Sequence, residues 1–167
     1  VGMLRAYAGY MKQTAFTFSQ DYIAETLVSQ SDITRNLVAL FKAYFDPRIN
    51  AEQNKPEARV ERLREKILQS LDALENLNED KILRRYFELI NATLRTNFYQ
   101  KNAAGEDKDY VSFKFSPRDI SNIPEPRPLF EIYVYSPRVE GVHLRGARVA
   151  RGGLRWSDRL QDYRTEI

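Results

Sequence analysis

The sequence predicts an α+β fold in which an N-terminal helical region precedes a small β-sheet. Before about residue 100, apolar side chains recur at helical spacing, and after about residue 110 they alternate every second residue. Five of the seven glycines and five of the seven prolines follow residue 100, where turns between strands are expected. A hydrophobic content of 43% in 167 residues is enough for a packed core.

Residues 1–46 are expected to form two or three short helices. Ser19 is a suitable N-cap, because its side-chain oxygen can accept a hydrogen bond from a backbone N–H one turn later. Asp46 precedes a proline and therefore avoids the helical region, which ends the segment. The polar residues 47–56 are interpreted as a linker. The apolar positions at helical spacing are Leu4, Tyr7, Met11, Tyr22, Ile23, Leu27, Ile33, Leu37, Leu40, Phe41 and Tyr44.

Residues 57–100 are expected to form an antiparallel helical hairpin. Asn78 is the predicted N-cap of the second helix, and the connection at 75–78 is short enough to require antiparallel neighbours. The alternative is that the apolar stripes pair with the helices of a partner, although about two to three heptads per helix favour packing within the fold. The stripes consist of Val60, Leu63, Ile67, Leu71 and Leu74, then Ile82, Tyr86, Leu89, Ile90, Thr93, Leu94 and Phe98.

Residues 110–167 are expected to begin a second domain, built on β-strands, after a hydrophilic turn at 102–109. A third β segment, 139–150, is expected to bend or bulge at Gly146 and to end at one edge of the sheet. Loops at strand ends are where binding groups are usually held. In the first two strands Val111, Phe113 and Phe115 alternate with Ser112, Lys114 and Ser116, and Phe130, Ile132 and Val134 alternate with Glu131, Tyr133 and Tyr135.

A glycine pair flanked by arginines follows the third β segment. Gly152 and Gly153 carry no Cβ, so the backbone can approach a ligand closely there. Arg151 and Arg155 each present a planar fork of donors that matches a carboxylate or a phosphate. This pattern indicates a site for an acidic small molecule. The alternative is an ordinary β-turn with solvated arginines.

The available residue types exclude several other kinds of site. Without cysteine and with His143 as the single histidine, the chain cannot assemble a thiolate metal site or a histidine-based triad, and no bound metal is expected. Trp156 among arginines would suit a stacking surface for nucleic acid, but 26 basic and 23 acidic residues are too balanced to favour that partner. No apolar run has the length of a membrane span. The absence of cysteine fits a cytoplasmic location, which is expected.

Several segments together resemble one protein family. Residues 150–159 read Ala-Arg-Gly-Gly-Leu-Arg-Trp-Ser-Asp-Arg, and they follow the proline-rich run 124–128 and the long block Phe130 to Gly146. This combination resembles the start of the catalytic region of the very large bacterial NAD-dependent glutamate dehydrogenases. The resemblance covers residues 110–167 strongly and the helical front half more loosely.

The resemblance implies roles for the glycine pair and its neighbour. Arg151 would bind the side-chain carboxylate of L-glutamate, at a position where the small hexameric glutamate dehydrogenases have a lysine. Compared with that lysine, an arginine keeps the positive charge, reaches farther and can bind the carboxylate through two parallel hydrogen bonds. The backbone of Gly152 and Gly153 would line the glutamate pocket. The catalytic lysine and the NAD site would both lie beyond Ile167.

We therefore expect a fragment of a homo-oligomeric parent enzyme that deaminates L-glutamate oxidatively with NAD, giving 2-oxoglutarate and ammonium. The fragment would contribute part of the glutamate pocket, with no catalytic or cofactor-binding residue of its own, and would be inactive alone. The alternative is a non-catalytic helical interaction or oligomerisation module in which the glycine pair is incidental.

Overall fold

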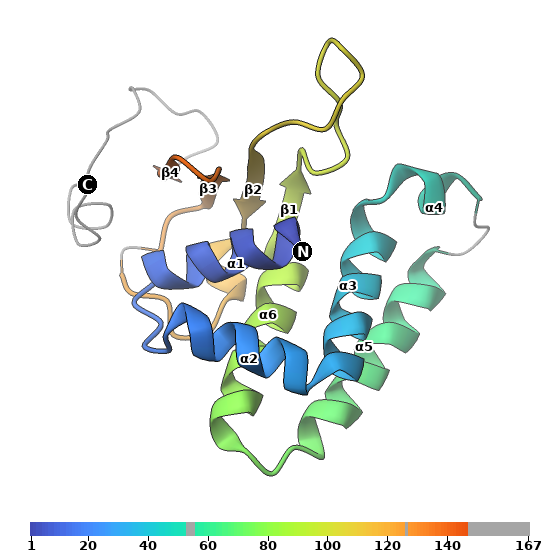
Figure 1. The fold of residues 1–167 in the computed structure, drawn as a ribbon, viewed down its shortest axis with the longest axis vertical. Helices are drawn as coiled ribbons and strands as arrows, with labels where there is room; N and C mark the ends of the chain where they lie inside the picture. The colour runs from blue at the N-terminus through green and yellow to red at the C-terminus, as the bar shows by residue number, and fades with distance from the viewer. Residues whose placement is uncertain (53–55, 126, 147–167) are drawn as a thin grey trace. The chain divides into compact units, whose positions relative to one another are not determined.

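The computed structural model describes residues 1–52, 56–125 and 127–146 (Figure 1). Helices precede a small antiparallel sheet in the described chain, which confirms the α+β class. The described elements, in chain order, are α1 (Gly2–Gln13), α2 (Gln20–Ser29), α3 (Ser31–Phe45), α4 (Pro47–Glu52), α5 (Pro56–Asp72), α6 (Leu77–Ala92), β1 (Thr93–Thr96), β2 (Val111–Phe115), the 3-10 turn η1 (Pro117–Asp119), β3 (Phe130–Tyr135) and β4 (Glu140–Arg145).

The chain divides into two compact units that do not follow the order of the predicted segments. The sheet unit combines Val1–Thr17 with the chain from Asn91 onward, and the helical unit is Phe18–Ile90. The first predicted segment is therefore split, because α1 belongs to the sheet unit while α2 and α3 belong to the helical unit.

The helical unit is built from amphipathic helices. Ser19 caps α2 as predicted, with its Oγ accepting a hydrogen bond from the backbone N–H of Tyr22 at 3.2 Å. Helix α3 packs against α5. The buried apolar side chains of this unit are Ile23, Ile33, Leu37, Leu40, Phe41, Ala43, Ile67, Leu71, Ile82, Leu83, Tyr86, Leu89 and Ile90.

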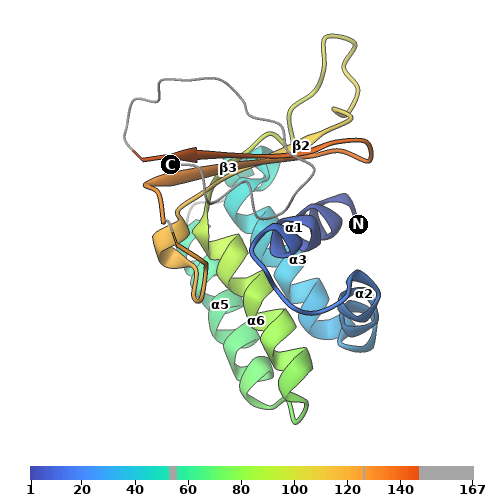
Figure 2. The ribbon, with the colours of Figure 1, turned by 90° about the vertical axis from the view of Figure 1, so that its left-hand side faces the viewer.

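Helices α5 and α6 form the predicted antiparallel hairpin (Figure 2). The guanidinium of Arg84 links the two helices. It lies 2.7 Å from a carboxylate oxygen of Asp72 in α5 and 2.7 Å from one of Asp80 in α6. The predicted N-cap of α6 was wrong. The side chain of Asn76, two residues earlier, accepts the hydrogen bond from the backbone N–H of Asn78 at 3.0 Å. Both asparagines have the chemistry of a cap, so the sequence pattern could not separate them.

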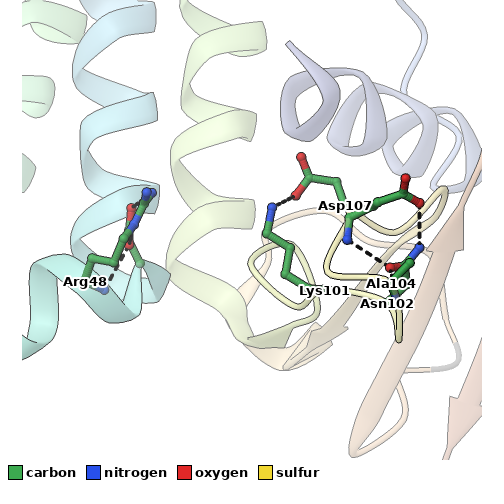
Figure 3. Close-up of polar contacts among 7 residues, drawn as sticks. Arg48, Lys101, Asn102, Ala104 and Asp107 are labelled. Atoms are coloured by element: carbon green, nitrogen blue, oxygen red, sulfur yellow. Dashed lines mark hydrogen bonds and ion pairs between the residues drawn. The ribbon is translucent and has the colours of Figure 1, made fainter.

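The segment predicted as a linker at 47–56 contains the short helix α4. Asp46, which is 3% exposed, precedes it, and its Oδ1 accepts a hydrogen bond from the backbone N–H of Arg48 at 3.0 Å. The Arg48 guanidinium lies 2.9 Å from the other carboxylate oxygen (Figure 3). The hydrogen bond from the Arg48 side chain is the main cause that lowers the pKa of the Asp46 carboxyl. Pro47 fits the first helical position because no backbone N–H is needed there.

Replacing Asp46 by asparagine should lower the free energy of unfolding by about 1 kcal/mol at neutral pH, because the amide can still cap the helix but loses the charge-assisted bond to Arg48. The folded-state pKa lies below the unfolded value of about 3.9, so this stabilisation is complete above that value and is lost as the pH falls through the folded pKa. Urea unfolding of both proteins at neutral and acid pH is the measurement. A difference that does not shrink in acid would contradict the prediction.

The sheet unit contains a described four-stranded antiparallel sheet in the order β1-β2-β3-β4. Strands β2 and β3 match the predicted strands. The prediction that the second hairpin helix continues to Phe98 was wrong, because α6 ends at Ala92 and β1 follows at once. Thr93 pairs with Phe115, and the register then shifts before Arg95, so the strand begins with an irregularity in its pairing. The two β-branched threonines of β1 were the signal for a strand.

The buried face of β3 is opposite to the one that the apolar alternation favours. Glu131 and Tyr133 are 0% exposed, whereas the alternate set beginning at Phe130 is half-buried. Residues that pair directly across antiparallel strands share a face, and Tyr133 pairs with Phe113 of β2. The register therefore places Tyr133 in the core. Its ring is apolar enough for that position, so polarity alone could not assign the faces.

The hydrophilic turn predicted at 102–109 is the tip of the connection between β1 and β2, and it carries its own hydrogen bonds (Figure 3). The Lys101 ammonium lies 2.6 Å from the Asp107 carboxylate, and these two residues also form a backbone bridge. Asn102 Oδ1 accepts a hydrogen bond from the backbone N–H of Ala104 at 2.9 Å. Gly105 has a φ of +80°, a conformation that favours glycine. These contacts give the tip a defined shape.

Candidate functional site

The site residues predicted from the sequence, Arg151, Gly152 and Gly153, lie outside the described residues. The strand that leads to them is described. Strand β4 occupies part of the predicted segment 139–150, and a bend follows it at Gly146 as predicted. The described part of the chain that precedes these residues is β4, together with the elements that hold this strand.

Strand β4 is paired with β3 along its whole length. The register runs from Tyr135 opposite Glu140 to Phe130 opposite Arg145, without a shift. Within the described sheet β4 is an edge strand, since β3 is its neighbour on one side only. Strand pairing fixes the position of β4 along β3. The tilt of β4 out of the sheet must be restrained by contacts from outside the sheet.

Helix α1 lies on one face of the sheet (Figure 2). Its aromatic side chains contact aromatic side chains on that face. The ring of Tyr7 stacks on Phe113, with centroids 4.4 Å apart and planes 5° apart, and its hydroxyl lies 2.8 Å from Thr93 Oγ1. The ring of Tyr10 lies 4.4 Å from that of Phe115. Tyr7 is fully buried, and burial raises the pKa of its hydroxyl well above the ordinary value, so the group stays neutral.

The last turn of α1 reaches β4 directly. Gln13 Nε2 donates a hydrogen bond to Glu140 Oε2 at 2.9 Å. One turn earlier, Gly9 lies so close to the sheet that a Cβ placed on it would overlap the Tyr133 hydroxyl. These contacts were not predicted from the sequence. The signal for close packing was a glycine in the middle of a helix, between two tyrosines that share one face.

The other face of the described sheet carries a lysine and the single histidine. The Lys114 ammonium lies 3.7 Å from the centroid of the Phe130 ring. His143, the single histidine, is half-buried and pairs with Ile132 on this face. No group of three or more potential metal ligands occurs among the described residues. Of the helices in the described part of the chain, none combines the length and the apolar composition that crossing a bilayer requires.

Comparison with known proteins gives matches along the whole chain. Residues 66–167 match the family model described as bacterial NAD-glutamate dehydrogenase, catalytic domain. Residues 1–47 match glutamate dehydrogenase, helical motif 3. Relatives named NAD-specific glutamate dehydrogenase are 57% identical over 167 residues in Halomonas elongata, 55% over 169 residues in Pseudomonas aeruginosa and 45% over 168 residues in Mycobacterium tuberculosis.

Each of these three alignments covers the complete chain and 10% of the relative, so the chain spans about one tenth of the length of the proteins it matches. The matches define the class of protein as a glutamate dehydrogenase that combines helical motifs with a catalytic domain. The chain belongs to the bacterial NAD-glutamate dehydrogenase family. The resemblance noted in the sequence is therefore confirmed.

The described residues do not fit an NAD site. Dinucleotides are bound at the switch point of a parallel sheet, where a glycine-rich turn leads from a strand into a helix. The described sheet is wholly antiparallel, and no described strand is followed by a glycine-rich turn that opens a helix. We assign NAD no binding residue within the described ranges.

Proposed function

We propose that the chain is the opening part of the substrate-binding region in an enzyme that oxidises L-glutamate with NAD, giving 2-oxoglutarate and ammonium. The observation that carries this proposal is the match of residues 66–167 to the catalytic domain of the family, which includes the glycine and arginine segment. In this proposal the parent enzyme is a cytoplasmic homo-oligomer that functions in glutamate catabolism, and NAD binds outside residues 1–167.

In the proposed site, Arg151 binds the distal carboxylate of glutamate, and the backbone of Gly152 and Gly153 lines the pocket. An arginine can form two parallel charge-assisted hydrogen bonds to one carboxylate, which fixes both its position and its orientation. Glycines allow the substrate to approach the main chain. The described register of β4 supports this proposal, because an unbroken strand leads toward the segment.

Residues 1–167 on their own should form no NADH from L-glutamate and NAD, whereas the full-length parent should do so under the same conditions. The reason is that the proposal places neither the nicotinamide nor the catalytic lysine in this part of the chain. Absorbance of NADH at saturating glutamate is the measurement, with a blank lacking protein as the control. Turnover above the blank by residues 1–167 would refute the proposal that the nicotinamide and the catalytic lysine lie outside this part of the chain.

The alternative, a helical interaction module, would need an apolar seam open to a partner. In the described helical unit the central positions of the predicted stripes, including Ile67 and Leu71 on α5 and Tyr86 and Leu89 on α6, are 0% or 1% exposed. These side chains are used within the fold. No specific observation favours the module over the enzyme.

A further inference from the structure

We propose that Gly9, Gln13 and Glu140 are positioning residues, through which helix α1 sets the position of β4 and so of the glutamate-binding segment that follows it. This inference rests on the proposed function of Arg151. It adds a role for a helix that lies more than a hundred residues earlier in the chain, in the region matched by helical motif 3.

The first contact is the hydrogen bond between α1 and β4. Gln13 is the last residue of α1, and its amide nitrogen lies 2.9 Å from Glu140 Oε2. Glu140 is the first residue of β4 and pairs with Tyr135 across the sheet. An amide donating to a carboxylate is a charge-assisted bond, stronger than one between neutral groups. It therefore restrains the beginning of the strand.

The second contact is the close approach of Gly9 to the sheet. A Cβ on this residue would overlap the Tyr133 hydroxyl and would lie 3.3 Å from Tyr135 Cδ2 and 3.4 Å from Glu140 Oε1. Tyr133 cannot give way easily, because its fully buried ring also packs at 5.4 Å from the ring of Tyr10. Glycine disfavours a helix interior, so its presence in α1 indicates that the short distance to the sheet matters more than helix propensity.

Strand β4 lies at the edge of the described sheet. Backbone pairing to β3 holds one edge of the strand, and nothing in that pairing fixes how far the strand tilts toward α1. The Gln13 and Gly9 contacts act on this face. Arg145, at the end of β4, is six residues before Arg151. A tilt of β4 would therefore displace the start of the segment that carries the proposed substrate contacts.

Two matched sets of variants in the full-length parent enzyme test the proposal. Gly9→Ala adds one methyl group where there is no room, and Gly2→Ala adds the same group to the same helix where nothing lies within 4 Å. Gln13→Glu places a second carboxylate against Glu140, and the double variant Gln13→Glu with Glu140→Gln restores an amide and carboxylate pair in reversed order. The measurements are KM and kcat for glutamate, KM for NAD, and the melting temperature.

Gln13→Glu should raise KM for glutamate by about 3- to 10-fold, with the loss of one net hydrogen bond as the upper limit, and Gly9→Ala should raise KM in the same direction because its methyl group pushes α1 away from the sheet. KM for NAD should stay unchanged, Gly2→Ala should behave as the wild type, and the double variant should recover the glutamate KM. An unchanged glutamate KM in soluble Gln13→Glu would overturn the proposal, even if Gly9→Ala fails to fold. So would an equal rise in both KM values, or no recovery in the double variant.

The Arg151→Met variant, assayed in parallel, separates this inference from the proposed function. If Arg151→Met shows no preference for glutamate over norvaline, the assignment of the substrate contact is wrong. If Arg151→Met is selective while Gln13→Glu leaves the glutamate KM unchanged, the substrate site stands and the positioning role of α1 is refuted.

Discussion

Replacing Arg151 by methionine in the parent enzyme is expected to lower kcat/KM for glutamate by about 30- to 1000-fold. The substitution removes a charge-assisted and bidentate contact worth about 2 to 4 kcal/mol, while the side chain keeps a similar length. The loss should be selective. Norvaline lacks the distal carboxylate, so its kcat/KM should change little, and Arg151→Lys should retain part of the glutamate activity because it keeps the charge.

The control for this experiment is Arg159→Met, which removes a cation from the same segment but not the proposed substrate contact. It should cost much less than Arg151→Met. If glutamate and norvaline lose activity equally in Arg151→Met, Arg151 is structural, and the substrate role of the segment must be abandoned.

Leu71→Ala should lower the free energy of unfolding by about 2 to 5 kcal/mol, because removal of a buried leucine side chain leaves a cavity in the helical unit. Leu71 is 1% exposed. Leu68, in the same helix α5, is 37% exposed and provides a matched control that removes the same atoms. Leu68→Ala should cost less than about 1 kcal/mol. Denaturant unfolding of residues 1–167 gives both values.

This pair of variants also distinguishes internal packing of the hairpin from a seam used by a partner. If Leu71 packed against a second chain, Leu71→Ala would weaken association between the chains. The molecular mass of the wild type from light scattering would then depend on concentration. Internal packing predicts a mass independent of concentration and a loss of stability within each molecule. Equal effects of Leu71→Ala and Leu68→Ala would contradict the packing described for α5.

The elements predicted correctly are those specified by neighbouring residues. The cap at Ser19 and the hairpin of α5 and α6 depend on residues within a few turns of one another. The assignment of Asn78 as a cap failed because Asn76 offers the same side chain nearby. The end of α6 at Ala92 was missed because a helix and a strand meet there with no turn residue between them.

The features that sequence reasoning could not predict depend on partners far away in the chain. Tyr133 is buried because it pairs with Phe113 and because helix α1 packs on the same face of the sheet. Neither contact produces a pattern among residues that neighbour Tyr133 in the sequence. The same holds for the approach of Gly9 to the sheet. For Arg151, Gly152 and Gly153, which lie outside the described residues, the assigned roles stay predictions carried by the family resemblance.

The division of the chain at residues 17 and 91 determines the order in which native contacts become possible during synthesis. Helix α1 is synthesised before the elements it contacts, since Tyr7 bonds to a residue 86 positions later and Gln13 to one 127 positions later. The helical unit, in contrast, has all of its own residues once Ile90 has been added. It can therefore complete its core while α1 still lacks its sheet. Until β2 and β3 are made, α1 lacks the sheet that its aromatic side chains contact, and nascent chains expose apolar surface to other molecules in such a situation.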